Sequence, residues 1–233
     1  MHRVCLRLVR VYMLYVVVYG WSAQYAVVAH VVDDKAHGVL NQIYHHYHVL
    51  KNFKAEYRVM LEDPDLNQVR RYKLLMVISG PCYKLCYDRK EVVTDGRTVW
   101  IYDDAFREVT IKNYKTDDAL LDITQLYTIC NRDYAGQYLK AYIAHKKKGV
   151  LRDVIKLNAR CIDNPIDNIV LEIERGSLKI CKWRIVYRNH AVCQGELSGF
   201  ATNLALGEDY FQFNVSDNKH LEVVDIREST DHQ

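Results

Sequence analysis

The chain has 233 residues, and its 32 Lys and Arg residues against 29 Asp and Glu residues give a formal net charge of +3. Arg3, Arg7 and Arg10 precede residue 29 and every acidic residue follows it, which leaves 29 basic against 29 acidic residues in the remainder. This neutral balance gives no support for nucleic-acid binding. The length allows one domain with a sizeable core.

The first 29 residues have the layout of a secretory signal peptide. Three arginines lead into an apolar run at residues 11–19, and small residues follow between 20 and 29, where we expect cleavage. The run is shorter than a comfortable membrane span, and an uncleaved anchor is the alternative. We therefore expect residues 1–29 to be removed and residues 30–233 to form a single soluble domain.

A helix is expected at residues 36–52, where apolar residues recur at helical spacing and Asp33 or Asp34 offers an N-terminal cap. The stripe consists of Val39, Ile43, Tyr47 and Leu50. His45 and His48 stand one turn apart, which would suit a metal ion. Both lie opposite the stripe and no third ligand is fixed nearby, so we favour a solvated helix face and predict no metal site.

From residue 53 the apolar period changes from helical to two, which indicates strands. The predicted strands include residues 53–62, 69–79, 83–87, 108–112, 134–144, 154–159, 168–175, 177–188 and 191–201, with an apolar tail at 211–226. Consecutive antiparallel strands with alternating faces predict a curved sheet or barrel.

The segment 92–102 predicts a tight hairpin around Asp95-Gly96. With a two-residue loop, Thr94 would pair with Arg97. The two faces would carry Val92, Val99 and Ile101 on one side and Val93, Trp100 and Tyr102 on the other. Because both faces are apolar, the sheet needs cover on both sides.

A second helix is predicted at residues 117–131, where the meander is interrupted by an apolar helical stripe. A helix inserted into a sheet and apolar on one side must lie on an apolar surface of that sheet. No internal repeat or linker divides the chain.

Enzyme signatures are missing from the sequence: there is no GxSxG elbow, no glycine-rich phosphate loop and no HExxH motif. The acid pairs Asp103-Asp104 and Asp117-Asp118 are adjacent residues at expected turns or caps, and nothing local holds two carboxyl groups together. We therefore predict a non-enzymatic protein without cofactor, built around a covered hydrophobic pocket.

Several segments resemble the periplasmic outer-membrane lipoprotein carrier proteins of the LolA type. The hairpin at 93–103, VTDGRTVWIYD, is similar to the family's SDGKTLW-x-Y hairpin. The lead-in LKNFKA at 50–55, MLEDP at 60–64 and Gly80-Pro81 also match, as do YFQF at 210–213 and VVDIR at 223–227. The likeness extends over roughly residues 36–227.

This resemblance implies an α+β, mainly β fold: an incomplete, strongly curved antiparallel barrel closed by a helical lid around an apolar cavity. It also implies a monomeric periplasmic carrier that takes acylated lipoproteins from an inner-membrane ABC exporter to the outer membrane, where a receptor could receive them. Exposed acyl chains cost about 0.8 kcal/mol per methylene, so crossing water requires a sheltering pocket.

Residues with apolar side chains on the expected inner faces are candidates for the cavity and its lid. The cavity candidates are Tyr57, Val59, Leu61, Tyr72, Leu74, Met76, Leu85, Trp100, Tyr102, Trp183 and Ile185. The lid candidates are Leu120, Ile123, Leu126 and Tyr127. Ordinary core packing is the alternative for each residue, and an error of one residue in register would invert a strand's whole set.

The sequence departs from the best-known carriers at one turn. Those carriers have Arg-Pro where this chain has Gly80-Pro81, and their arginine is thought to latch the lid. No latch can be carried over to Gly80, and the alternatives are a lid that is held otherwise or one that stands open more often. A periplasmic carrier of glycolipid or phospholipid, and a binding module that senses mislocalised lipoproteins, are the alternative functions.

Overall fold

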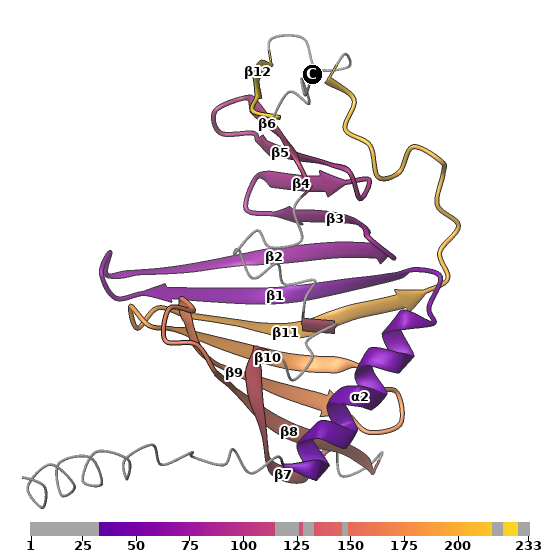
Figure 1. Ribbon diagram of the computed structural model, residues 1–233, viewed down its shortest axis with the longest axis vertical. Coiled ribbons are helices and arrows are strands. Elements are labelled where there is room, and N and C mark those ends of the chain that lie inside the picture. The colour runs from indigo at the N-terminus through magenta and orange to yellow at the C-terminus, as the bar shows by residue number, and fades with distance from the viewer. Residues whose placement is uncertain (1–32, 115–125, 128–132, 146–148, 216–220, 228–233) are drawn as a thin grey trace, which may run out of the picture. The chain divides into compact units, whose positions relative to one another are not determined.

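The computed structural model describes residues 33–114, 126–127, 133–145, 149–215 and 221–227 (Figure 1). In this part of the chain one helix, α2 (Asp34–His48), precedes a sheet of 12 strands. The strands are β1 (Phe53–Asp63), β2 (Gln68–Ser79), β3 (Cys82–Tyr87), β4 (Lys90–Thr94), β5 (Thr98–Asp103), β6 (Glu108–Asn113), β7 (Tyr134–His145), β8 (Val150–Ala159), β9 (Ile166–Glu174), β10 (Ile180–Tyr187), β11 (Val192–Thr202) and β12 (Glu222–Asp225).

The strands form a single sheet in the order β12-β6-β5-β4-β3-β2-β1-β11-β10-β9-β8-β7. All neighbours are antiparallel except β12, which pairs in parallel with β6. The end strands β12 and β7 do not pair with each other, so the sheet is curved but unclosed (Figure 1). The predicted fold class, a mainly β protein with an incomplete barrel, is confirmed.

Helix α2 is fixed at its N-terminus by Asp33. One carboxylate oxygen of Asp33 accepts hydrogen bonds from the backbone N–H groups of Lys35 and Ala36, at 3.1 and 3.0 Å, as an N-cap does. The other oxygen accepts from the backbone N–H of Tyr138 on β7 at 2.7 Å. One side chain therefore both starts the helix and ties it to the sheet. These backbone hydrogen bonds, first that of Ala36, lower the pKa of Asp33.

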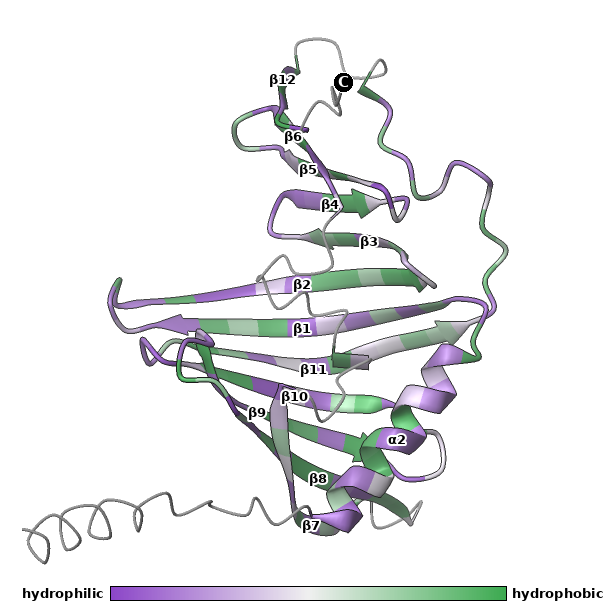
Figure 2. Cartoon of the chain, viewed as in Figure 1, coloured by the Kyte–Doolittle hydropathy of each residue, from purple (hydrophilic) through white to green (hydrophobic). Residues whose placement is uncertain are grey.

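The face of the sheet that carries α2 is called the inner face here. On that face α2 buries Ala36, Leu40, Ile43 and Tyr47. A Cβ atom on Gly136 of β7 would lie 3.2 Å from Leu40 and 3.3 Å from Ala36, so the missing side chain lets the helix approach the strand closely. Hydrophobic residues recur along the strands, whereas the turn between β1 and β2 is mainly polar (Figure 2).

The predicted hairpin at 92–102 forms with a different register. Thr94 pairs with Val99 and Val92 with Ile101, so the predicted two-residue loop is wrong: the loop is two residues longer. The longer loop is stabilised by Asp95, whose carboxylate accepts from the backbone N–H groups of Arg97 and Thr98 at 2.8 and 2.7 Å. A shift of two residues keeps each side chain on its predicted face.

Two sequence predictions lie largely outside the described residues. The signal peptide at 1–29 is one of them. The other is the helix at 117–131, of which Leu126 and Tyr127 are described, in a short helical turn. No helix among the described residues is long and apolar enough to span a membrane.

Candidate functional site: the covered inner face of the sheet

The inner face of the sheet carries one continuous apolar cluster from β3 to β8. Cross-strand pairing places the side chains of Ala55, Met76 and Leu85 in one row, and those of Val59, Gly195 and Trp183 in another. Isoleucine and leucine side chains of β8 and β9 extend the cluster towards α2. These are Ile155, Leu157, Ile166, Ile169, Leu171 and Ile173, each at most 1% exposed.

Most of the predicted cavity residues lie together in this cluster. Tyr57, Val59, Leu74, Met76, Leu85, Trp183 and Ile185 are buried members, and Leu61 and Tyr72 are partly buried and pack against them. The described lid residues Leu126 and Tyr127 belong to the same cluster, each 2% exposed. Leu120 and Ile123 lie outside the described residues. The sheet and the segment at 126–127 are therefore in contact over the inner face.

Trp100 and Tyr102 lie on the opposite, outer face. Trp100 pairs with Val93 and Ile111, and that row continues through Lys84 to Val77 instead of through Met76 and Leu85. The ring of Tyr102 lies 5.5 Å from that of Phe213, in the segment that follows β11. Their place in the predicted cavity is corrected: both belong to a second apolar layer on the other side of the sheet.

The two faces of β5 could not be told apart from their sequence because both are apolar. Val77, Val93, Val109 and Ile111 share the outer face with Trp100 and are buried as well. The apolar residues of the segment 210–213 are the sequence signal for a buried outer face, since they supply a cover for it.

Two tyrosines connect the segment at 126–127 to the sheet. The hydroxyl of Tyr57 donates to the backbone carbonyl of Ile180 at 2.8 Å, so it accepts the hydroxyl proton of Tyr127 across 2.6 Å. Burial raises the pKa of both phenols, which keeps them neutral and able to donate. Tyr127 also packs against the rings of Tyr47 and Phe53, with centroids at 4.5 and 4.8 Å.

Trp183 lies at the centre of the inner face, 2% exposed, with its ring centroid 6.0 Å from that of Tyr57. Its indole Nε1 is buried and has no hydrogen-bond partner among the described residues. Such a donor normally has an acceptor in a folded protein. The inner face is therefore apolar around one unpaired indole donor.

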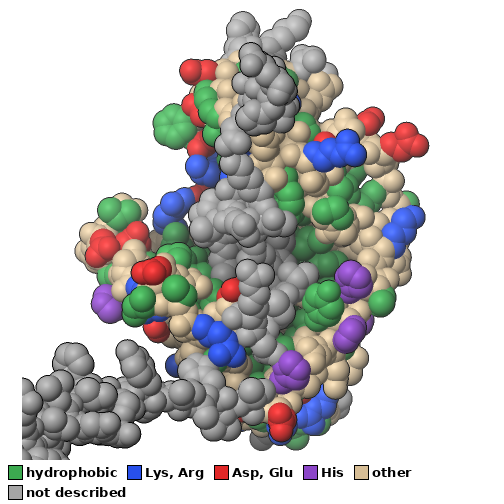
Figure 3. Space-filling view, viewed as in Figure 1, with side chains coloured by type: hydrophobic (Ala, Val, Ile, Leu, Met, Phe, Trp, Pro, Cys, Tyr) green, Lys and Arg blue, Asp and Glu red, His purple; other side chains and the backbone are tan. Residues whose placement is uncertain are grey.

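A metal site and a catalytic pair of carboxylates have less support. His45 and His48 are exposed and pack against the exposed ring of Tyr44, and histidine side chains gather at the surface over α2 (Figure 3). No group of three or more potential metal ligands occurs in the part of the chain that the structure describes. Asp103 and Asp104 are held by Lys90 at 2.6 Å and Arg89 at 2.8 Å, and these cations lower the pKa of each carboxyl group.

The chain matches no protein-family model and no curated protein. Among solved structures, an uncharacterized conserved protein from Thermus thermophilus has a TM-score of 0.55 at 10% identity, over 82% of this chain and 99% of that one. A LolA superfamily protein from Nitrosomonas europaea has a TM-score of 0.39 at 10% identity, over 76% and 97% of the two chains. The lipoprotein LppX of Mycobacterium tuberculosis has a TM-score of 0.42 at 12% identity, over 75% and 98%. The chain is therefore similar in fold to the uncharacterized protein from Thermus thermophilus.

Proposed function

We propose that the protein is an exported, non-enzymatic carrier that binds the acyl chains of lipoproteins on the inner face of its sheet. In this proposal it carries them through the periplasm from the inner to the outer membrane, receiving them from an ABC exporter and delivering them to the membrane or a receptor. The observation that supports this is the apolar cluster of the inner face, with Leu126 and Tyr127 packed on it.

An acyl chain that displaces the cover must offset the hydrogen bond between Tyr57 and Tyr127 and the packing of Leu126 and Tyr127 on the inner face. The hydrogen bond between Tyr57 and Tyr127 contributes about 0.5–1.5 kcal/mol net, as a neutral intramolecular bond does. Burial of an acyl chain contributes about 0.8 kcal/mol for each methylene. A few methylenes in contact with the inner face therefore offset the loss of the tyrosine pair. After release of the acyl chain, the same hydrogen bond and packing would let the cover close again.

The experiment is native mass spectrometry of the protein with a detergent-extracted triacylated lipoprotein. We expect a one-to-one complex that is lost when the acyl chains are removed. Leu126→Glu, which places a charge between the cover and the inner face, should abolish the complex. Leu66→Glu is the matched control, because Leu66 is 64% exposed in the turn between β1 and β2.

Two results would change the assignment. Binding of free phospholipid without binding of the lipoprotein would identify a carrier of another lipid. A folded Leu126→Glu variant with unchanged affinity would remove the inner face as the binding site.

A further inference from the structure

A groove of the sheet is lined mainly by residues of the outer face, together with Val59, Tyr72, Trp183 and Gly195 of the inner face. Its volume is about 700 Å³, within the range of small-molecule sites. Its lining comes from β1, β2, β9, β10 and β11: Arg58, Val59, Met60, Arg71, Tyr72, Lys73, Val170, Glu172, Lys182, Trp183, Arg184, Gln194, Gly195 and Glu196.

Cross-strand pairing arranges the outward side chains of this groove in two rows. One row runs Lys73, Arg58, Glu196, Lys182, Glu172, and the second runs Arg71, Met60, Gln194, Arg184, Val170. The first row contains both carboxylates of the groove. The second contains two arginines and no acid.

The two carboxylates of the groove are already engaged. Glu196 lies 3.7 Å from Arg58 and 3.5 Å from Lys182. Glu172 accepts the hydroxyl proton of Tyr142 at 2.5 Å and lies 3.5 Å from Arg152. Both acids are therefore compensated by neighbouring donors.

Three cations of the groove, Arg71, Lys73 and Arg184, are exposed and have no carboxylate partner among the described residues. Lys73 also lies directly opposite Arg58 on β1, an arrangement that costs stability because like charges face each other. A face selected only for solvation would pair opposite charges at such positions. The excess positive charge indicates that the groove is adapted to an anion.

The spacing of these cations suits a compact anionic group. Arg71 and Arg184 are separated by β1 and β11, so their strands are about 14 Å apart at three spacings of about 4.8 Å. Their long side chains can both reach a group held above Met60 and Gln194. Guanidinium forks bind phosphate oxygens in pairs, and the lysine adds a third charge.

We propose that this groove binds a phosphate-bearing ligand. The phosphate lies between Arg71 and Arg184 with Lys73 beside it, and the rest of the ligand lies along Met60 and Val170. Because Arg71, Lys73 and Arg184 belong to the outer-face rows, the proposal does not depend on carriage of acyl chains.

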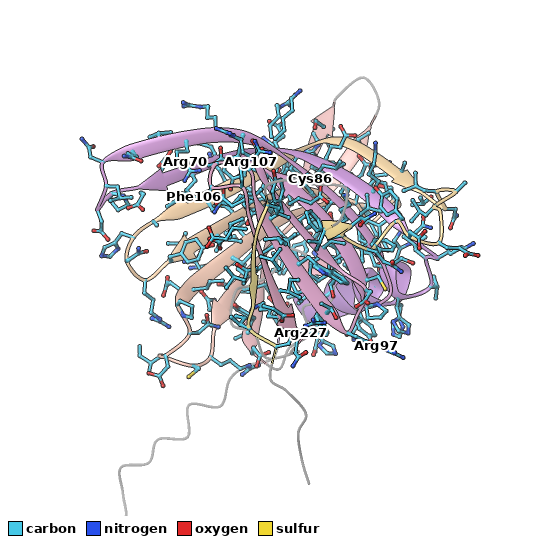
Figure 4. All side chains as sticks on the ribbon, turned by 90° about the horizontal axis from the view of Figure 1, so that it is seen from above. Arg70, Cys86, Arg97, Phe106, Arg107 and Arg227 are labelled. Carbon is cyan, nitrogen blue, oxygen red and sulfur yellow. The ribbon has the colours of Figure 1, made fainter. Side chains whose placement is uncertain are left out.

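The test measures binding of free phosphate and of phosphate on a lipid. The probes are inorganic phosphate and glycerol 3-phosphate by calorimetry, and vesicles of phosphatidylcholine with and without phosphatidylglycerol by co-sedimentation. We expect the Arg71→Gln/Arg184→Gln variant to bind its probe about tenfold more weakly or worse, since each arginine provides charged hydrogen bonds. The control Arg97→Gln/Arg107→Gln removes the same charge from two turns of the β4–β6 region (Figure 4) and should bind within about twofold of the unmodified protein.

The outcomes separate the sources of the phosphate. Binding of the soluble probes, lost in the variant, supports a free phosphate compound; binding only of vesicles that contain phosphatidylglycerol, lost in the variant, supports a lipid headgroup. The proposal is overturned if no probe binds, if the variant and the control lose affinity equally, or if a polyglutamate peptide binds as tightly as the phosphate probes. Binding of the lipoprotein by the Arg71→Gln/Arg184→Gln variant tests the proposed function of the inner face separately, because both arginines lie on the outer face.

Discussion

Trp183 occupies the space that a side chain at position 195 would fill. A Cβ atom on Gly195 would lie 2.4 Å from Cε2 and Cζ2 of the indole and 2.6 Å from its Nε1. The two residues pair across β10 and β11, so the largest side chain of the inner face lies flat over the smallest residue of the neighbouring strand.

Gly195→Ala should therefore destabilise the protein by about 1–3 kcal/mol, as overpacking of a core does, because the added Cβ atom would overlap the buried indole of Trp183. Urea denaturation followed by circular dichroism measures the change. Gly38→Ala is the matched control. No atom lies within 4 Å of its added Cβ in α2, so we expect about 0.5–1 kcal/mol of added stability. Equal stability of the Gly195→Ala variant and the unmodified protein would contradict the packing described.

The tyrosine pair on the inner face predicts unequal effects for its two hydroxyl groups. Tyr57→Phe removes the partner of both Tyr127 and the Ile180 carbonyl, so it should cost about 1–3 kcal/mol, as the loss of a buried partner does. Tyr127→Phe leaves the Tyr57–Ile180 bond intact and should cost less. A double-mutant cycle should give a coupling energy above about 0.5 kcal/mol. Additive losses would show that the two hydroxyl groups are independent.

Cys193 predicts a loss of stability in alkaline solution. Burial raises the pKa of its thiol from 9.0 to about 11 in the folded protein. The folded state therefore retains a proton that the unfolded state loses, and this stabilisation is full below pH 9 and falls as the pH rises through 11. Denaturation between about pH 8 and 11 should show a shallower decline for Cys193→Ala. Cys161→Ala, which removes an exposed thiol, is the matched control.

Asp153 predicts the opposite dependence in acid. It is 5% exposed and accepts hydrogen bonds from Nε of Arg175 at 3.0 Å and from the hydroxyl of Tyr138 at 2.6 Å. The hydrogen bond from Arg175 is the main reason that the pKa of Asp153 lies below 3.8 in the folded protein. The resulting stabilisation is present above pH 3.8, the pKa of the unfolded state, and is lost as the pH falls through the lower pKa of the folded state.

Asp153→Asn should cost about 1–3 kcal/mol near neutral pH, since Arg175 and Tyr138 lose their charged acceptor. The variant should also lose less stability than the unmodified protein between about pH 4 and 2. An unchanged acid profile would mean that Asp153 does not carry this dependence. Urea denaturation at each pH measures both effects.

The alternation of apolar residues was sufficient to predict most of the strands and their faces. The predicted segments 53–62 and 69–79 became β1 and β2 with Tyr57 and Leu74 opposite each other on the inner face. Period-two patterns are reliable in these strands because one face is apolar and the other is charged, as with Arg58 and Lys73.

The errors arose where the local pattern holds no information about the partner. β5 is apolar on both faces, and the outer-face contact of Tyr102 is with Phe213, which is more than a hundred residues away. The hydrogen bond between Tyr57 and Tyr127 is likewise a contact between distant segments. Such contacts are set by the path of the sheet and not by the spacing within one strand.

The order of strands in the sheet has a consequence for how the protein folds. β1 to β6 and β7 to β11 are two series of neighbouring hairpins, and the ladder between Phe53 and Thr202 at β1 and β11 joins them. Hairpins between adjacent strands close short loops and form within microseconds, whereas the β1–β11 ladder must first bring together residues about 150 positions apart. Non-local pairing of this kind slows folding. Substitutions in the β1–β11 ladder should therefore change the refolding rate, whereas substitutions in the outer hairpins should change mainly the unfolding rate.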